Sequence, residues 1–243
     1  MKSQQQAKRR RNRRIAVAAG AIVAFLGVVL TAQLTGGRSP VAAPAAPTAS
    51  ASAGGARTGE LAFVRRQQSD PMAVGDVDAP VVLVQWTDMR CPYCAVFNRE
   101  TLPVLRREYV DTGKVRIEVH DVAYFGEQSE NAAIAARAAA EQGRFFEYLS
   151  AVYKEAPEHG HPELPRERLI AFAEKAGVPD IARFTADLDD SGLRAAAAAS
   201  NGEAERLGVT SVPFFVAGNS ALSGAQPTSV FREYLDAAIA KAG

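Results

Sequence analysis

Cysteine is almost absent from this chain. Only two of its 243 residues are cysteines, and two residues separate them in Cys91-Pro92-Tyr93-Cys94. This scarcity excludes a scaffold stapled by several disulfides, because such scaffolds need more cysteine pairs. Histidine is nearly as rare, with three residues. The scarcity of both disfavours a zinc finger, since a tetrahedral zinc site needs four Cys or His ligands at characteristic spacings.

Acidic residues are missing from the start of the chain, which has no Asp or Glu before Glu60. Residues 1–14 carry seven Lys or Arg, and residues 15–34 carry no charge. A helix of about 20 apolar residues spans a bilayer core of about 30 Å. The basic flank therefore predicts a cytoplasmic tail at 1–14 and a single-pass membrane anchor at 15–34, with the rest of the chain extracytoplasmic. A cleaved signal peptide is the alternative, although its apolar region is normally about 7–15 residues long.

The next segment has the composition of a linker. Residues 35–59 are mostly Gly, Pro, Ala, Ser and Thr, which cannot build a core. The folded part is expected over 60–243, where 27 acidic residues stand against 19 basic ones. This negative balance argues against nucleic acid as a partner, because neutralising phosphates needs a basic face. We expect a monomer that is held at the cell membrane by its N-terminal helix.

The hydrophobic pattern of the folded part predicts a mixed α/β fold with a long helical block in its middle. Strands are expected at 72–74, 81–86, 115–120, 212–216 and 221–222, with a turn at Gly218-Asn219 between the last two. Helices are expected at 92–109 with a kink at Pro103, at 129–142 with Ser129 as N-cap, and at 145–155, 165–176, 179–188, 193–207 and 228–240. The strand, helix and strand over 81–120 predict a parallel βαβ unit.

The two cysteines follow a buried strand and precede a helical stretch, so the first thiol stands at a helix N-terminus. Unpaired N–H groups and the helix dipole stabilise a thiolate there. Because the thiolate is the nucleophile of disulfide exchange, the motif predicts a thiol–disulfide oxidoreductase. Cys91 is expected to attack and Cys94 to resolve the mixed disulfide. Pro92 suits the first helical turn, and Tyr93 is expected to tune the stability of the thiolate.

Two other interpretations of the cysteine pair are weaker. A zinc site would need ligands from His120, His159 and His161, but the last two are expected to be solvated loop residues. A purely structural disulfide would close too short a loop to add much stability. We therefore predict no metal site, and no cofactor other than the redox-active disulfide between the two cysteines.

Further candidates for the site lie before and far after the motif. Asp88 has two possible roles. Its carboxylate exchanges a proton with Cys94, or Asp88 is a turn residue that caps the helix at Cys91. Pro213 interrupts an apolar strand, so it is either a trans edge proline or follows a cis bond that presents the Val212 backbone to an extended substrate. Trp86, the only tryptophan, is expected close enough to the cysteines for their disulfide to quench its fluorescence.

Two motifs in this order, TDMRCPYC and, about 120 residues later, GVTSVPFFVAGNSALSGAQP, resemble the DsbA-like thiol–disulfide oxidoreductases of bacterial envelopes. The resemblance covers about residues 70–243. It implies a thioredoxin fold, a mixed sheet with flanking helices, with a helical domain inserted at about 127–207. It also implies a cis Val212–Pro213 bond beside Cys91. The partners it implies are reduced exported proteins as substrates and a membrane quinone-linked thiol oxidase for re-oxidation.

The dipeptide between the cysteines departs from the strong oxidants of that family, which carry Pro-His where this chain has Pro92-Tyr93. The imidazole that would help to hold the thiolate is absent, and Pro-Tyr resembles the more reducing glutaredoxins. The prediction is therefore a dithiol oxidase outside the cytoplasm. An envelope reductase and a non-catalytic binding module of the same fold are the alternatives.

Overall fold

The computed structural model describes residues 60–242. The predicted tail at 1–14, membrane anchor at 15–34 and linker at 35–59 lie outside the described residues. In the part that is described, no helix is both long and apolar enough to cross a membrane.

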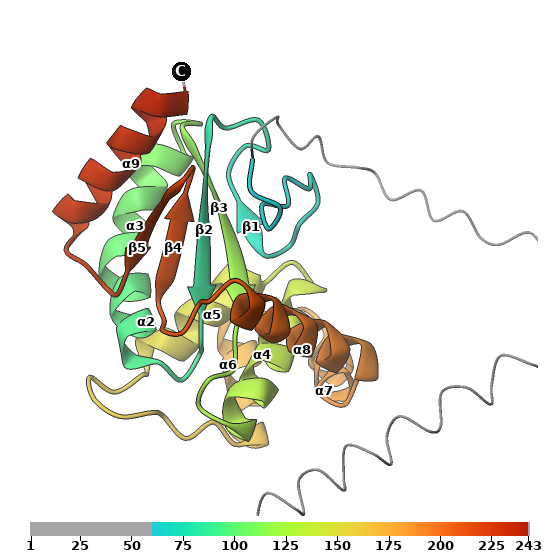
Figure 1. The fold of residues 1–243 in the computed structure, drawn as a ribbon. Coiled ribbons are helices and arrows are strands. Elements are labelled where there is room, and N and C mark those ends of the chain that lie inside the picture. Colours follow the sequence, from blue (N-terminus) through green and yellow to red (C-terminus); the bar gives the residue numbers. More distant parts are fainter. Residues whose placement is uncertain (1–59, 243) are drawn as a thin grey trace, which may run out of the picture. The chain divides into compact units, whose positions relative to one another are not determined.

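A mixed sheet of five strands stands at the centre, in the order β1-β3-β2-β4-β5 (Figure 1). β2 (Val81–Thr87) and β3 (Val115–Asp121) are parallel, as the βαβ pattern predicts, and every residue of both strands is buried. β1 (Ala73–Val74) pairs antiparallel with β3, and β4 (Phe214–Ala217) pairs antiparallel with β2. β5 (Ser220–Ser223) completes the hairpin through the predicted turn.

The helix after β2 is not a regular α-helix. It alternates between α and π turns: α2 (Pro92–Val96), η1 (Phe97–Thr101), α3 (Leu102–Leu105) and η2 (Arg106–Val110). Pro103 has no N–H to donate to the preceding turn, and the wide turn η1 comes directly before α3. α3 and α9 (Thr228–Ala242) lie side by side against one side of the sheet (Figure 1).

The helical block connects β3 to β4. It comprises α4 (Glu127–Ala140), α5 (Phe145–Lys154), α6 (Arg166–Lys175), α7 (Ile181–Asp187) and α8 (Ser191–Arg206). α7 and α8 begin after Asp180 and Asp190, because the carboxylate of each accepts a backbone hydrogen bond of 2.8 Å from the first helical turn. The predicted N-cap of α4 is wrong, since Gly126 holds that position and Ser129 is buried in the first turn.

Side chains of β2 alternate between two hydrophobic clusters. Leu83 packs in the cluster that contains both cysteines, whereas Trp86 packs in the other. The indole contacts Phe63, His120 and Phe214, with ring centroids 5.1, 5.3 and 5.9 Å away. The indole thus packs on the other side of the sheet from the cysteine cluster, because side chains alternate along the strand, and the expected change of its fluorescence between the oxidised and reduced forms stays a prediction.

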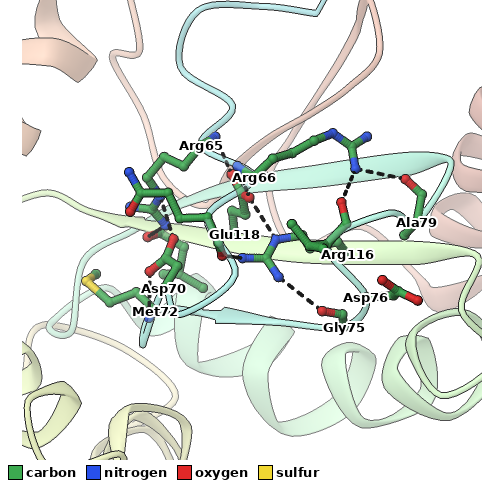
Figure 2. Close-up of polar contacts among 12 residues, drawn as sticks. Arg65, Arg66, Asp70, Met72, Gly75, Asp76, Ala79, Arg116 and Glu118 are labelled. Carbon is green, nitrogen blue, oxygen red and sulfur yellow. Dashed lines mark hydrogen bonds and ion pairs between the residues drawn. The ribbon is translucent and has the colours of Figure 1, made fainter. Parts of the chain in front are cut away.

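A charged network is buried over the polar side of β3 (Figure 2). Glu118 is fully buried and accepts hydrogen bonds from the backbone N–H groups of Arg65 and Arg66, at 2.7 and 2.9 Å. It also accepts one from Nε of Arg116 at 2.8 Å, and Arg116 donates in turn to the carbonyl of Gly75 at 3.0 Å. These bonds attach the segment before β2 to β3. That segment covers the polar side chains of β3, which in a strand of alternating polar and apolar residues often face solvent.

Candidate active site

Cys91 stands at the junction of β2 and α2. Its backbone is extended, with φ −77° and ψ 120°, and Pro92 occupies the first turn of the helix. The N–H of Cys91 donates to the carbonyl of Asp88 at 3.0 Å, which closes the turn between strand and helix. The thiol therefore lies at a helix N-terminus, as the spacing predicts. Both cysteines are thiols in this structure, and they are 3% (Cys91) and 0% (Cys94) exposed.

The two thiols differ in acidity. The pKa of Cys91 is lowered, chiefly because the Cys94 thiol hydrogen bonds to its sulfur. The backbone N–H groups of Cys94 and Tyr93 act in the same direction, against the effect of burial. Burial raises the pKa of Cys94 well above its ordinary value, and its contact with Cys91 adds to this rise. Because the thiolate reacts, Cys91 is the cysteine suited to attack or to leave near neutral pH.

A distant loop reaches the first thiol. The Val212–Pro213 peptide bond is cis, as the family resemblance implies, and β4 begins directly after it. Sγ of Cys91 donates a hydrogen bond of 3.4 Å to the carbonyl of Val212. The structure thus brings Cys91, Cys94, Val212 and Pro213 to one place.

The carboxylate of Asp88 is fully buried beside the strand-to-helix turn. Oδ1 accepts hydrogen bonds from the N–H of Arg90 at 2.8 Å and from the hydroxyl of Ser129 at 2.9 Å, and Oδ2 accepts one from the N–H of Tyr124 at 2.8 Å. Burial raises the pKa of Asp88 in spite of these donors. Asp88 is a turn residue, but the capping interpretation is wrong, because α2 has no side-chain cap.

Two residues that the sequence analysis did not single out hold the surroundings together. Tyr124, whose N–H holds Asp88, also donates its hydroxyl to the carbonyl of Val209 in the loop before the cis bond. Arg90 donates to the carbonyls of Phe125 at 2.6 Å and Pro162 at 2.9 Å. Both residues follow the carboxyl ends of parallel strands, where sites of α/β proteins gather, and this is the signal that could have found them.

The three histidines have different surroundings. His120 is buried, and burial together with the charges of Arg65 and Arg137 lowers its pKa to about 3. The ring of His161 stacks on Phe125 with centroids 3.8 Å apart, and its Nδ1 lies 3.0 Å from the Arg90 carbonyl oxygen. His159 and His161 are both exposed in the loop between α5 and α6, as expected, and His161 has these two contacts in addition. Over residues 60–242, no group of three or more His, Cys, Asp or Glu side chains is arranged to hold a metal ion.

A groove of about 830 Å³ borders Cys91. Its walls come from the helix start, from the loop after β3, from the loop between α5 and α6, and from the end of α8 with the loop before the cis bond. The residues that line it are Cys91, Pro92, Tyr93, Tyr124, Phe125, Glu158, His159, Gly160, His161, Glu205, Val209, Thr210, Ser211 and Val212. A groove that borders a reactive thiol and the residue before a cis proline suits an extended segment of another protein.

Comparison with known proteins agrees with this geometry. The profile of the family described as thioredoxin matches residues 67–237. Over 157 residues the chain is 27% identical to the "Probable disulfide bond formation protein D" of Bacillus cereus, a match that covers 63% of this chain and 73% of that protein. These matches and the cysteine motif agree on one chemistry, the exchange of thiols and disulfides.

Solved structures share the fold. BdbD from Bacillus subtilis superimposes with a TM-score of 0.65 at 18% identity, over 71% of this chain and 94% of that one. The α-DsbA1 of Wolbachia pipientis superimposes with a TM-score of 0.62 at 20% identity, over 70% of this chain and 92% of that one. The predicted thioredoxin fold, a mixed sheet with flanking helices, is confirmed.

Proposed function

The chain belongs to the thioredoxin family as a DsbA-like thiol–disulfide oxidoreductase, and from this premise we propose that it donates a disulfide to reduced exported proteins. The observation that carries the proposal is the opposite acidity of the two thiols, with the pKa of Cys91 lowered and that of Cys94 raised. A stabilised Cys91 thiolate favours the reduced form of the enzyme. The Cys91–Cys94 disulfide is then an oxidant for other dithiols.

The reaction transfers two electrons in two steps, and in this scheme the cysteine pair is the only redox group. A substrate thiolate attacks Sγ of Cys91, which borders the groove; a mixed disulfide forms, the Cys91–Cys94 bond breaks and Cys94 leaves with the electron pair. A second substrate thiolate then attacks the substrate sulfur of the mixed disulfide. Cys91 leaves as a thiolate, and the substrate departs with a new disulfide.

Neighbouring residues position these groups. Pro92 has no N–H, and the N–H groups of Tyr93 and Cys94 hydrogen bond to the Cys91 sulfur. The carbonyl of Val212 lies 3.4 Å from the same sulfur. We assign to Val212, held before Pro213, the pairing with the extended backbone of the substrate.

We assign to Asp88 the exchange of a proton with Cys94. Asp88 gives Cys94 a proton when Cys94 leaves the disulfide, and takes the proton back when Cys94 attacks a mixed disulfide. The support is a buried carboxyl with a raised pKa on the residue whose backbone hydrogen bonds to Cys94. A carboxyl of raised pKa takes up and releases protons closer to neutral pH than an ordinary one does.

Asp88→Asn is expected to slow the resolution of a mixed disulfide by Cys94 at least about tenfold, because a positioned general base typically contributes about 10²–10⁴-fold. The pKa of Cys91 should fall further, since the charge of Asp88 opposes the thiolate. Single-turnover release of a peptide linked to Cys91 measures the first effect, and thiolate absorbance measures the second. Ser129→Ala keeps the carboxylate and should slow release far less. Release at the wild-type rate in Asp88→Asn would leave Asp88 as a turn residue only.

The reduction potential separates an oxidase from a reductase. We expect equilibration with glutathione to give a value above about −250 mV, within the range of about −270 to −120 mV of thioredoxin-like proteins. Tyr93→His, which supplies an imidazole beside the thiolate, should raise the value further. A potential below about −250 mV overturns the oxidase and assigns an envelope reductase, the direction that the Pro-Tyr dipeptide favours.

Residues 15–34, as a membrane anchor, would place this chemistry on the extracytoplasmic side of the cell membrane. A membrane quinone-linked thiol oxidase would then take the two electrons from the reduced cysteines. Fractionation of cells that make the full chain tests the placement.

A further inference from the structure

The groove beside Cys91 has two carboxylates in its lining and, among the residues that the structure describes, no Lys or Arg to pair with them. Glu158, on the loop between α5 and α6, and Glu205, near the end of α8, are exposed lining residues, and no Lys or Arg of residues 60–242 lines the groove. Neither carboxylate has an ion-pair partner in that part of the chain, although Glu205 accepts a hydrogen bond of 2.8 Å from Asn201. Both carboxylates are therefore available to pair with a cation that a ligand brings.

The arginine beside the motif does not supply this cation. The guanidinium of Arg90 donates to the carbonyls of Phe125 and Pro162, and one of its nitrogens lies 3.7 Å from Glu163. The guanidinium is thus already bound to the loop after β3 and to the loop between α5 and α6. Its charge is directed toward Glu163, which does not line the groove.

Aromatic rings stand in the same groove. The side chain of Tyr93 is 64% exposed, and Phe125 is half-buried with His161 stacked on it. A planar guanidinium both stacks on aromatic rings and pairs with carboxylates through two parallel hydrogen bonds. A lysine ammonium makes neither planar contact, so this combination of rings and carboxylates favours arginine.

We propose that the groove selects reduced protein segments that carry an arginine within three residues of the cysteine to be oxidised. This inference rests on the proposed function and adds the class of substrate to it. An extended segment advances about 3.3 Å per residue, so such an arginine lies within about 10 Å of the cysteine along the segment. Its long side chain adds to this reach.

The test uses three dithiol peptides that differ only at one position near the reactive cysteine, which holds Arg, Gln or Glu. The oxidised full-length protein should oxidise the Arg peptide about three- to tenfold faster than the Glu peptide, since each exposed ion pair contributes up to about fivefold. The Gln peptide should fall between them. The ratio should shrink as salt rises toward about 0.3 M, because the charges are exposed.

An arginine also makes the peptide's own thiol more acidic, and this intrinsic effect has to be subtracted. Reaction of the same peptides with hydroxyethyl disulfide, an uncharged small molecule, measures it. The double variant Glu158→Gln/Glu205→Gln should show an Arg-to-Glu ratio close to this intrinsic value. The matched control Glu174→Gln/Glu233→Gln removes the same charge from exposed positions on α6 and α9, and should keep the wild-type ratio.

A wild-type ratio no larger than the intrinsic value overturns the inference. So does a groove variant that keeps the wild-type ratio, or a control that loses it equally, since the overall charge of the domain would then be the cause. Failure of the proposed function looks different, because the Gln peptide would then not be oxidised at all.

Discussion

Cys91→Ser is expected to lower the oxidation of a dithiol substrate by at least about a thousandfold, because a hydroxyl cannot form the mixed disulfide through which both steps pass. Cys94→Ala, in contrast, is expected to hold substrates as mixed disulfides. It leaves a Cys91 thiolate that can attack the disulfide of an oxidised substrate, so that a mixed disulfide forms while the second substrate sulfur leaves as a thiolate, and it removes the thiol of Cys94 that would release the substrate. Such a variant should accumulate Cys91-linked substrates in the cell.

Non-reducing electrophoresis followed by mass spectrometry measures these adducts, and the identified proteins name the substrates. The double variant Cys91→Ser/Cys94→Ala, which has no thiol, is the matched control and should show no adducts. Full biological activity of Cys91→Ser would contradict the oxidoreductase and favour a binding module of the same fold.

Glu118→Ala is expected to lower the free energy of unfolding by about 3–5 kcal/mol, the cost of breaking a buried ion pair by removing one partner. The change leaves the guanidinium of Arg116 without its carboxylate, and the N–H groups of Arg65 and Arg66 without an acceptor (Figure 2). Chemical denaturation followed by circular dichroism measures the change in stability.

The matched control for this variant is Glu108→Ala, which removes a carboxylate from an exposed ion pair with Arg232. Its unfolding midpoint should barely move, because solvent screens exposed pairs. Equal effects of the two variants would show that the buried network over β3 contributes no more than a surface contact.

The sequence was sufficient for the residues whose chemistry is local. Cys91 and Cys94 are recognisable from their spacing and from the strand before them, and Pro213 from a second motif that appears in the right order. The alternation of side chains along a strand also indicates that Trp86, three residues after Leu83, faces the opposite side of the sheet, as the structure has it.

The remaining contacts depend on segments that meet only in the folded chain. The sequence around Ser129 has no pattern that predicts the hydrogen bond from its hydroxyl to Asp88, 41 residues earlier. The segment before β2 has little periodicity, so its cover over Arg116 and Glu118 could not be predicted from pattern. The partners of Arg90 likewise lie in two loops that come after β3 and after α5.

Tyr124 connects the inside of the active site to its rim, since one residue holds both the buried carboxylate and the loop before the cis bond. A protein segment that docks on that loop therefore acts on the same residue that orients Asp88. We therefore expect the acid strength of the buried carboxyl to differ between the empty enzyme and the enzyme with a docked client.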